Sequence, residues 1–151
     1  MKTILFLLLV VPVFGYAQKA EKKEVRRVID QLFEGMRKGD SSMVRKTFFP
    51  NATLNTSFVN KKGEAKFHCD SIHSFLNAIG KPHEEVWDER LLSCEIKIDD
   101  NLATVWTKYA FYVDNVYSHE GVNAFQLVKT DGSWKILIIT DTRRKNNSKI
   151  K

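Results

Sequence analysis

The chain has 151 residues and a formal net charge of +6, and this length indicates one domain. Six basic residues lie near its two ends: Lys2, Arg143, Arg144, Lys145, Lys149 and Lys151. Basic and acidic residues balance in the rest of the chain, whereas nucleic-acid binding normally needs a basic face on the domain itself. The composition therefore argues against a nucleic-acid-binding protein. Residues 144–151 are expected to form a solvated basic tail, with weak attraction to an acidic membrane surface as a minor alternative.

The first seventeen residues have the pattern of a secretory signal peptide. Lys2 supplies a positive start, residues 4–11 form an apolar run, and Gly15 and Ala17 place small residues where a signal peptidase reads. The apolar run is too short for a spanning helix, so no membrane span is expected. We expect cleavage after Ala17 and a secreted or periplasmic protein, with a retained N-terminal anchor as the alternative.

Two helices are predicted at the start of the mature chain. Apolar residues recur at helical spacing over residues 25–36, and Gly39 is placed to end that helix. Asp40 or Ser41 can cap a second, short helix, which Pro50 stops.

A short strand pair and a third helix come next. Residues 52–58 alternate in polarity as a strand does, residues 65–68 form a return strand, and a helix follows from about Asp70 to Gly80. The chain then changes to four long strands with tight connections, at residues 86–98, 102–113, 117–129 and 134–142. Helices followed by a strand meander predict an α+β fold, with the helices packed on one face of an antiparallel sheet.

Strict alternation divides the long strands into two faces. The face expected to line a core and a pocket carries Val105, Thr107, Tyr109, Phe111, His119, Gly121, Asn123, Phe125, Trp134, Ile136, Ile138 and Thr140. By the same alternation, Tyr109 and Asp141 lie on opposite faces. A salt-bridged strand end is the favoured interpretation of Asp141, with a pocket acid as the alternative. The opposite face includes Trp106 and is too apolar to be left bare, so we expect a homodimer that packs sheet on sheet.

The order of these elements resembles the nuclear transport factor 2-like superfamily over residues 20–143. The closing segments 105–109, 118–128, 132–136 and 140–143 are similar to its SnoaL-like, "putative lumazine-binding" branch. The resemblance implies a cone-shaped barrel in which N-terminal helices pack on a strongly bent antiparallel sheet that encloses a pocket. It does not fix an activity, because this fold carries enzymes and non-catalytic proteins alike. The domain is therefore placed at residues 18–143, between the signal peptide and the tail.

His119 is the best single candidate for chemistry. The spacing of His119, Gly121 and Asn123 puts all three on one side of a strand, and an imidazole can act as acid or base near neutral pH. Asn123 can pair with a ring carbonyl or amide, and Gly121 leaves space for a ligand between the two side chains. The alternative is that His119 and Asn123 satisfy buried backbone groups or each other.

Aromatic residues are the expected wall of a pocket for a flat ligand, with core packing as the alternative: Trp87, Tyr109, Phe111 and Trp134. No cofactor motif is present, and the scattered His68, His73 and His83 do not predict a metal site. Whether Cys69 and Cys94 form a disulfide stays open, because the sequence does not give their separation.

Three functions remain in competition. The leading hypothesis is an exported protein that binds a small aromatic or apolar molecule without a demonstrated reaction. The second is an isomerase, dehydratase or cyclase that uses His119 as acid or base. The third is a structural or partner-binding module with a solidly packed core.

Overall fold

A computed structural model describes residues 13–145, with side chains from Gln18 onward. Most of the expected signal peptide, residues 1–12, and most of the expected tail, residues 146–151, lie outside this range. The elements are α1 (Val13–Lys38), α2 (Ser41–Arg45), β1 (Phe48–Val59), β2 (Ala65–Ser71), α3 (Ile72–Gly80), β3 (Trp87–Asp99), β4 (Leu102–Val113), β5 (Val116–Thr130) and β6 (Ser133–Arg144). No helix between residues 13 and 145 is long and apolar enough to cross a membrane.

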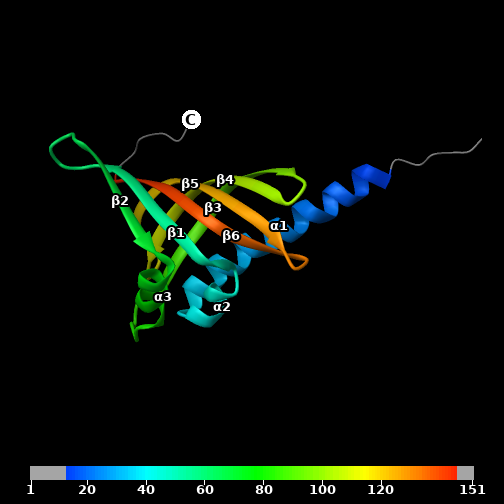
Figure 1. Cartoon of the computed structure of the whole chain (residues 1–151). Helices are drawn as coiled ribbons and strands as arrows, with labels where there is room; N and C mark the ends of the chain where they lie inside the picture. Colours follow the sequence, from blue (N-terminus) through cyan, green and yellow to red (C-terminus); the bar gives the residue numbers. More distant parts are fainter. Residues whose placement is uncertain (1–12, 146–151) are drawn as a thin grey trace, which may run out of the picture.

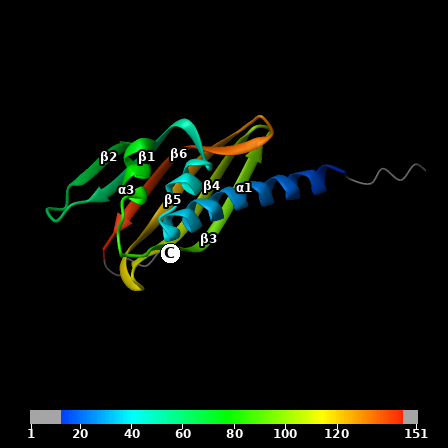
Figure 2. The same ribbon diagram turned by 90° about the horizontal axis from the view of Figure 1, so that it is seen from below.

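The six strands form one curved sheet in the order β2-β1-β6-β5-β4-β3, with the helices gathered on its concave side (Figure 1). Seen from below, α1 runs across the sheet and projects beyond it at its N-terminal end (Figure 2). The predicted α+β architecture is confirmed. The sheet is not wholly antiparallel, however, because the last strand inserts beside the first and pairs with it in parallel.

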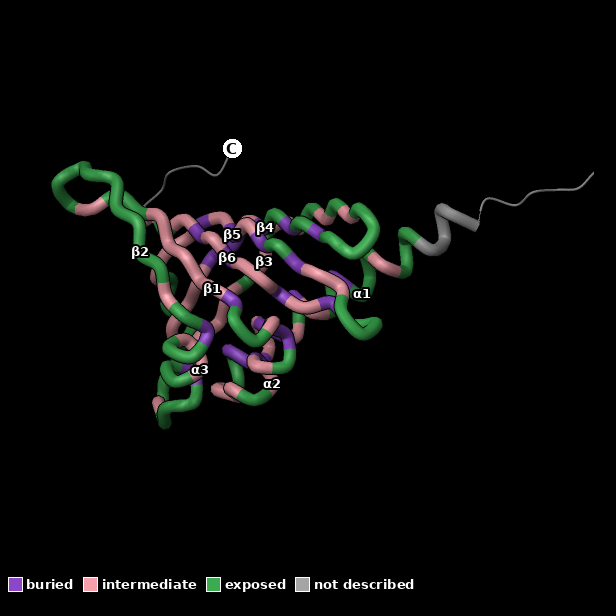
Figure 3. The backbone as a smooth tube through the Cα atoms, in the orientation of Figure 1, coloured by how far each residue is buried: buried purple, intermediate pink, exposed green. Residues whose placement is uncertain are grey.

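The core lies between α1 and the concave face of the sheet. Four α1 residues at helical spacing are buried, namely Val25, Ile29, Leu32 and Met36. They face rows of apolar side chains that cross the strands, such as Val105 of β4, Phe125 of β5 and Ile139 of β6. Buried residues follow the central strands, whereas the β1–β2 hairpin is largely exposed (Figure 3).

Local signals at the helix ends are mostly as predicted. The Asp40 side chain accepts a hydrogen bond from the Met43 amide at 2.8 Å and so caps α2. Gly39 adopts a positive φ of 65° between α1 and α2, which suits a helix C-terminus. Pro50, expected to stop α2, instead lies inside β1, where the pairing with β6 shifts register.

The two cysteines are far apart in the sheet. Cys69 lies on edge strand β2 and Cys94 on the opposite edge strand β3, and both are free thiols. An intramolecular disulfide between them is therefore excluded by distance.

Gly121 of β5 is a point of close approach. A Cβ atom there would overlap the Thr142 carbonyl oxygen of β6 and lie 2.8 Å from the Tyr109 ring. The expectation that Gly121 leaves room for a ligand is wrong, because the Tyr109 ring occupies that space. The glycine instead allows a buried tyrosine to lie flat against the strand.

Replacement of Gly121 by Ala is therefore expected to lower the free energy of unfolding by about 3 kcal/mol, since backbone and ring must both move. Urea unfolding would measure the loss. The matched control is Gln126→Ala, an exposed position on the same strand, with an expected change within about 0.5 kcal/mol. Equal stability of the two variants would contradict this account of Gly121.

Candidate functional site

Polar side chains gather at one end of the concave face. Register places Glu89, Phe111 and His119 in one row across β3, β4 and β5. Two rows further along, Thr107, Asn123 and Asp141 lie side by side on β4, β5 and β6. Beyond them the rows become apolar. The concave face thus has a polar end and a hydrocarbon end.

Tyr109 connects these rows. Its side chain is 1% exposed, and its hydroxyl lies 3.0 Å from the Thr142 carbonyl oxygen and 3.3 Å from Asp141 Oδ2. The hydroxyl has one proton, so it donates to one of these oxygens at a time. Asp141 Oδ2 also accepts a hydrogen bond from Arg143 Nε at 2.8 Å. Burial raises the pKa of Tyr109, and the Asp141 carboxylate adds to the rise.

The prediction that Tyr109 and Asp141 lie on opposite faces is wrong. A β-bulge shifts the β5–β6 register between Gln126 and Leu127, where β6 has one residue more than its partner. After the bulge, Ile139 and Asp141 point into the core, and Ile138 and Thr140 point outward, the reverse of strict alternation. The predicted salt bridge at the strand end is present, as Asp141 with Arg143.

Asn123 is 5% exposed and is held by two neighbours. Its amide nitrogen donates to Glu89 Oε1 at 2.7 Å and to Thr107 Oγ1 at 3.2 Å. Both amide hydrogens are therefore committed within the protein. Asn123 lies in the predicted place, but its donors serve a carboxyl group that the sequence did not single out.

Glu89 is the most perturbed acid of the site. Burial raises its pKa to about 8, and the nearby Asp141 carboxylate adds to the rise, while the Asn123 hydrogen bond opposes it. The carboxyl group is consequently protonated in most molecules at pH 7. Its side chain is half-buried, so solvent still reaches it.

His119 lies beside two aromatic rings. Its ring centroid is 5.8 Å from that of Tyr109, edge to face, and 5.0 Å from that of Phe111. The Ser118 hydroxyl lies 3.1 Å from His119 Nδ1. Burial lowers the pKa of His119, and the Arg143 charge lowers it further, so the imidazole is neutral at pH 7.

The remaining two predicted pocket residues, Trp87 and Trp134, take no part in these polar contacts. Trp87, at the start of β3, stacks on His83, with the two ring centroids 4.6 Å apart. Trp134 is at the far end of β6, where its indole nitrogen donates to Glu21 Oε2 at 2.7 Å. Glu21 also pairs with Lys129, which ties α1 to the β5–β6 hairpin.

Sequence reasoning missed Glu89 and the inward turn of Asp141, and it placed Thr107 on the inner face without assigning it to the site. Glu89 lies in an Asp-Glu-Arg run, and such a run of charged residues usually indicates a strand exposed to solvent. Its inward position follows from the parity of Trp87 and Leu91, which is the signal that could have identified it. Between residues 13 and 145, no group of three His, Cys, Asp or Glu side chains is arranged to hold a metal ion.

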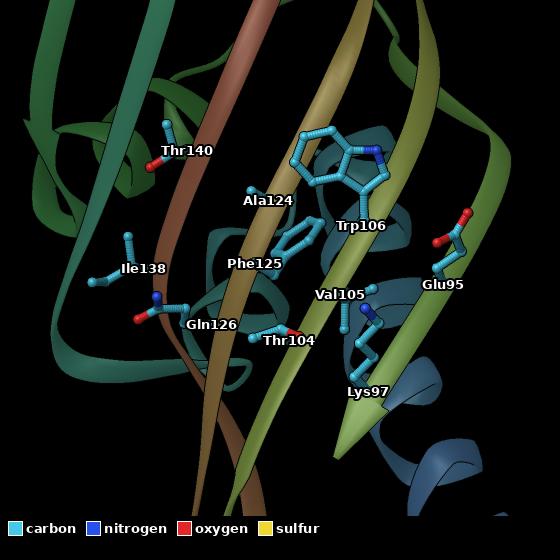
Figure 4. A pocket seen from close by; sticks show the side chains of 10 residues that line it. All are labelled: Glu95, Lys97, Thr104, Val105, Trp106, Ala124, Phe125, Gln126, Ile138 and Thr140. Atoms are coloured by element: carbon cyan, nitrogen blue, oxygen red, sulfur yellow. The ribbon is translucent and has the colours of Figure 1, made fainter. Parts of the chain in front are cut away.

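A separate groove of about 470 Å³ lies on the outer face of the sheet, away from the helices (Figure 4). Trp106 stands over it and is 50% exposed, and Glu95, Lys97 and Gln126 supply polar groups. The sequence prediction placed Trp106 on this outer face, and that placement is confirmed.

A sequence model of the family described as "Putative lumazine-binding" matches residues 20–139. The chain belongs to this family. Solved structures similar to this chain are described as ntf2-like, in agreement with the predicted fold of helices packed on a bent sheet. No curated protein matches the sequence closely enough to count as a relative.

Three solved structures with this fold are distant from this chain in sequence. A protein of unknown function from Mycobacterium tuberculosis is 12% identical with a TM-score of 0.71, and the match covers 91% of this chain and 80% of that one. A "Putative Scytalone Dehydratase" from Novosphingobium aromaticivorans is 13% identical with a TM-score of 0.68, covering 91% and 94%. An ntf2-like protein of unknown function from Shewanella baltica is 18% identical with a TM-score of 0.62, covering 87% and 98%. At these identities the likeness establishes the fold of this family member and no activity.

The raised pKa of Glu89 predicts a pH-dependent stability. The folded state keeps the Glu89 proton up to about pH 8, whereas the unfolded chain releases it near the ordinary value of 4.5. This contribution to stability is complete below pH 4.5 and is lost as the pH rises through 8. Replacement of Glu89 by Gln should remove this pH dependence, because glutamine does not titrate. At about pH 9 the free energy of unfolding of the variant, relative to wild type, should be about 2 kcal/mol higher than it is at low pH, after allowance for partial exposure of Glu89.

Urea unfolding of both proteins between about pH 5 and pH 9 gives the difference between their free energies of unfolding. Groups that titrate alike in both proteins do not affect this difference. Glu95→Gln is the matched control, because Glu95 is an exposed carboxylate on the outer face of the same strand. A stability difference between Glu89→Gln and wild type that does not change with pH would show that Glu89 titrates normally.

Proposed function

We propose that this protein binds a small, flat aromatic or apolar molecule at the polar end of its concave face. The half-exposed side chains of Phe111 and His119 offer a wall for such a ring, with Trp87 nearby on β3. Buried Tyr109 and Asn123 form the layer beneath. The family's "Putative lumazine-binding" description supports a flat ring ligand.

One observation carries the proposal: the carboxyl groups of Glu89 and Asp141 lie on the concave face of the sheet, where core packing alone would favour apolar side chains. Placing ionisable groups at core positions costs stability unless each is neutral or paired. Here Asp141 is paired with Arg143, and the raised pKa keeps Glu89 neutral. Perturbed groups gathered in this way are typical of binding and catalytic sites.

A second candidate function is acid–base catalysis of an elimination or isomerisation. Glu89 is a protonated acid at pH 7 and His119 a neutral base, and they flank Phe111 on adjacent strands. In a dehydration, His119 would take a proton from carbon while Glu89 protonates the departing hydroxyl, which leaves as water. The dehydratase names of two structural relatives favour this class.

Two further elements of the proposal concern the state of the protein. The pattern of residues 1–17 supports export, with cleavage after Ala17. The exposed outer face supports a homodimer, since Leu92, Leu102, Trp106 and Tyr117 are each more than 40% exposed there. Glu95 and Lys97 on the same face can pair across a two-fold axis.

Ligand binding is tested by mass spectrometry of small molecules released from natively purified protein. His119→Ala should retain about tenfold less ligand than wild type, because the ring wall loses one side. Gln126→Ala, on the outer face of the same strand, should retain the wild-type amount. Equal retention by both variants would place the ligand elsewhere, and absence of any released molecule would favour a purely structural role.

Dimerisation is tested by light scattering during gel filtration. Trp106→Asp should convert a dimer to a monomer, because a charge replaces the most prominent apolar side chain of the outer groove. Val86→Asp, at an exposed apolar residue in the loop before β3, should remain dimeric. A monomeric wild-type protein would refute the homodimer.

A further inference from the structure

Glu89 has one oxygen that the protein leaves unused. Oε1 accepts the Asn123 hydrogen bond, whereas no hydrogen bond in the part of the chain that the structure describes involves Oε2. Oε2 is also not among the fully buried unpaired atoms of that part, and the Glu89 residue is half-buried. The carboxyl group thus keeps one oxygen unpaired, while its other oxygen is held in place by Asn123.

Asn123 accounts for that fixed position. Its two amide hydrogens go to Glu89 and Thr107, so a ligand cannot draw on them without breaking a buried contact. Because Thr107 is fully buried, its hydrogen bond holds the Asn123 amide group in one orientation. Asn123 is therefore a positioning residue for Glu89.

The surroundings decide which oxygen carries hydrogen. Asp141 and Arg143 of β6 are the charged groups that act on Glu89, and the guanidinium is already bonded to Asp141. His119 of β5 and Tyr109 of β4, the other titratable groups of this end, are both neutral at pH 7. Because Arg143 is engaged by Asp141, its charge lowers the pKa of Glu89 less than burial raises it, and the acid stays protonated at pH 7. Because Oε1 accepts from Asn123, the proton is on Oε2.

We propose that Glu89 is the ligand-selecting residue of this site: its Oε2–H group donates a hydrogen bond to a carbonyl oxygen, or a similar uncharged acceptor, on a flat ligand held against Phe111 and His119. This inference rests on the proposed binding function. It narrows the ligand class from any apolar molecule to ring compounds that carry a hydrogen-bond acceptor at their edge.

The test uses isothermal titration calorimetry with two probes of similar shape, methyl naphthyl ketone and isopropenylnaphthalene, which differ in having an oxygen or a methylene group at one position. Wild-type protein at about pH 6 should bind the ketone about tenfold more tightly, the worth of one hydrogen bond. At about pH 10, where Glu89 has lost its proton, the two dissociation constants should become equal.

Two variants separate the donor from other causes. Glu89→Gln keeps an acceptor for Asn123 and a donor for the ligand, so it should prefer the ketone at both pH values. Glu89→Leu has no donor and should bind both probes equally. If Glu89→Leu does not fold, as judged by circular dichroism, the pH independence of Glu89→Gln decides.

Three outcomes would overturn the inference in distinguishable ways. A ketone preference that survives in folded Glu89→Leu, or in wild type at about pH 10, assigns the donor to another residue and leaves the binding function intact. Equal binding of both probes by wild type at about pH 6 removes the acceptor requirement. Failure of wild type to bind either probe would remove the proposed binding function itself.

Discussion

The β-bulge in the β5–β6 ladder is the constraint on which the polar end of the molecule depends. One extra residue in β6 reverses the facing of every side chain beyond it, which turns Asp141 inward and sends Thr140 out. Without that reversal, the Asp141 carboxylate would not lie beside the Tyr109 hydroxyl. The bulge therefore converts a strand that begins as core, with Trp134 and Ile136, into one that ends as part of a polar cluster.

That cluster is internally balanced, which explains how it persists in a core position. Arg143 forms an ion pair with Asp141, and the Tyr109 hydroxyl lies within hydrogen-bond distance of two acceptors. The Asn123 amide donates its two hydrogens to the side-chain oxygens of Glu89 and Thr107. Glu89 avoids the cost of an unpaired charge by remaining protonated. The same balance leaves the Glu89 proton without an acceptor among the described residues. A network with one unpaired hydrogen-bond donor is suited to ligand binding, because a ligand can accept that hydrogen bond without breaking the other hydrogen bonds of the network.

Much of this architecture could be predicted from the sequence. The helical spacing of Val25 to Met36, the turn signals between the strands and the apolar alternation gave the helix and strand order, and hence the fold. His119 and Asn123 were placed on the concave side by parity alone. The site was predicted only in part, because parity fails beyond a bulge and no local signal marks one in residues 135–138. Glu89 was missed because a charged run on an edge strand is usually solvated.

The parallel pairing of β1 with β6 has a consequence for how the molecule comes together. These strands are separated by most of the chain, and β6 is the link between the β1–β2 hairpin and the β3–β5 meander. The two halves of the sheet cannot join until the last strand has been synthesised, and closing so long a loop makes acquisition of the native state slow. On a growing chain the sheet therefore stays incomplete until residues 133–144 are available for pairing, whatever hairpins have already formed.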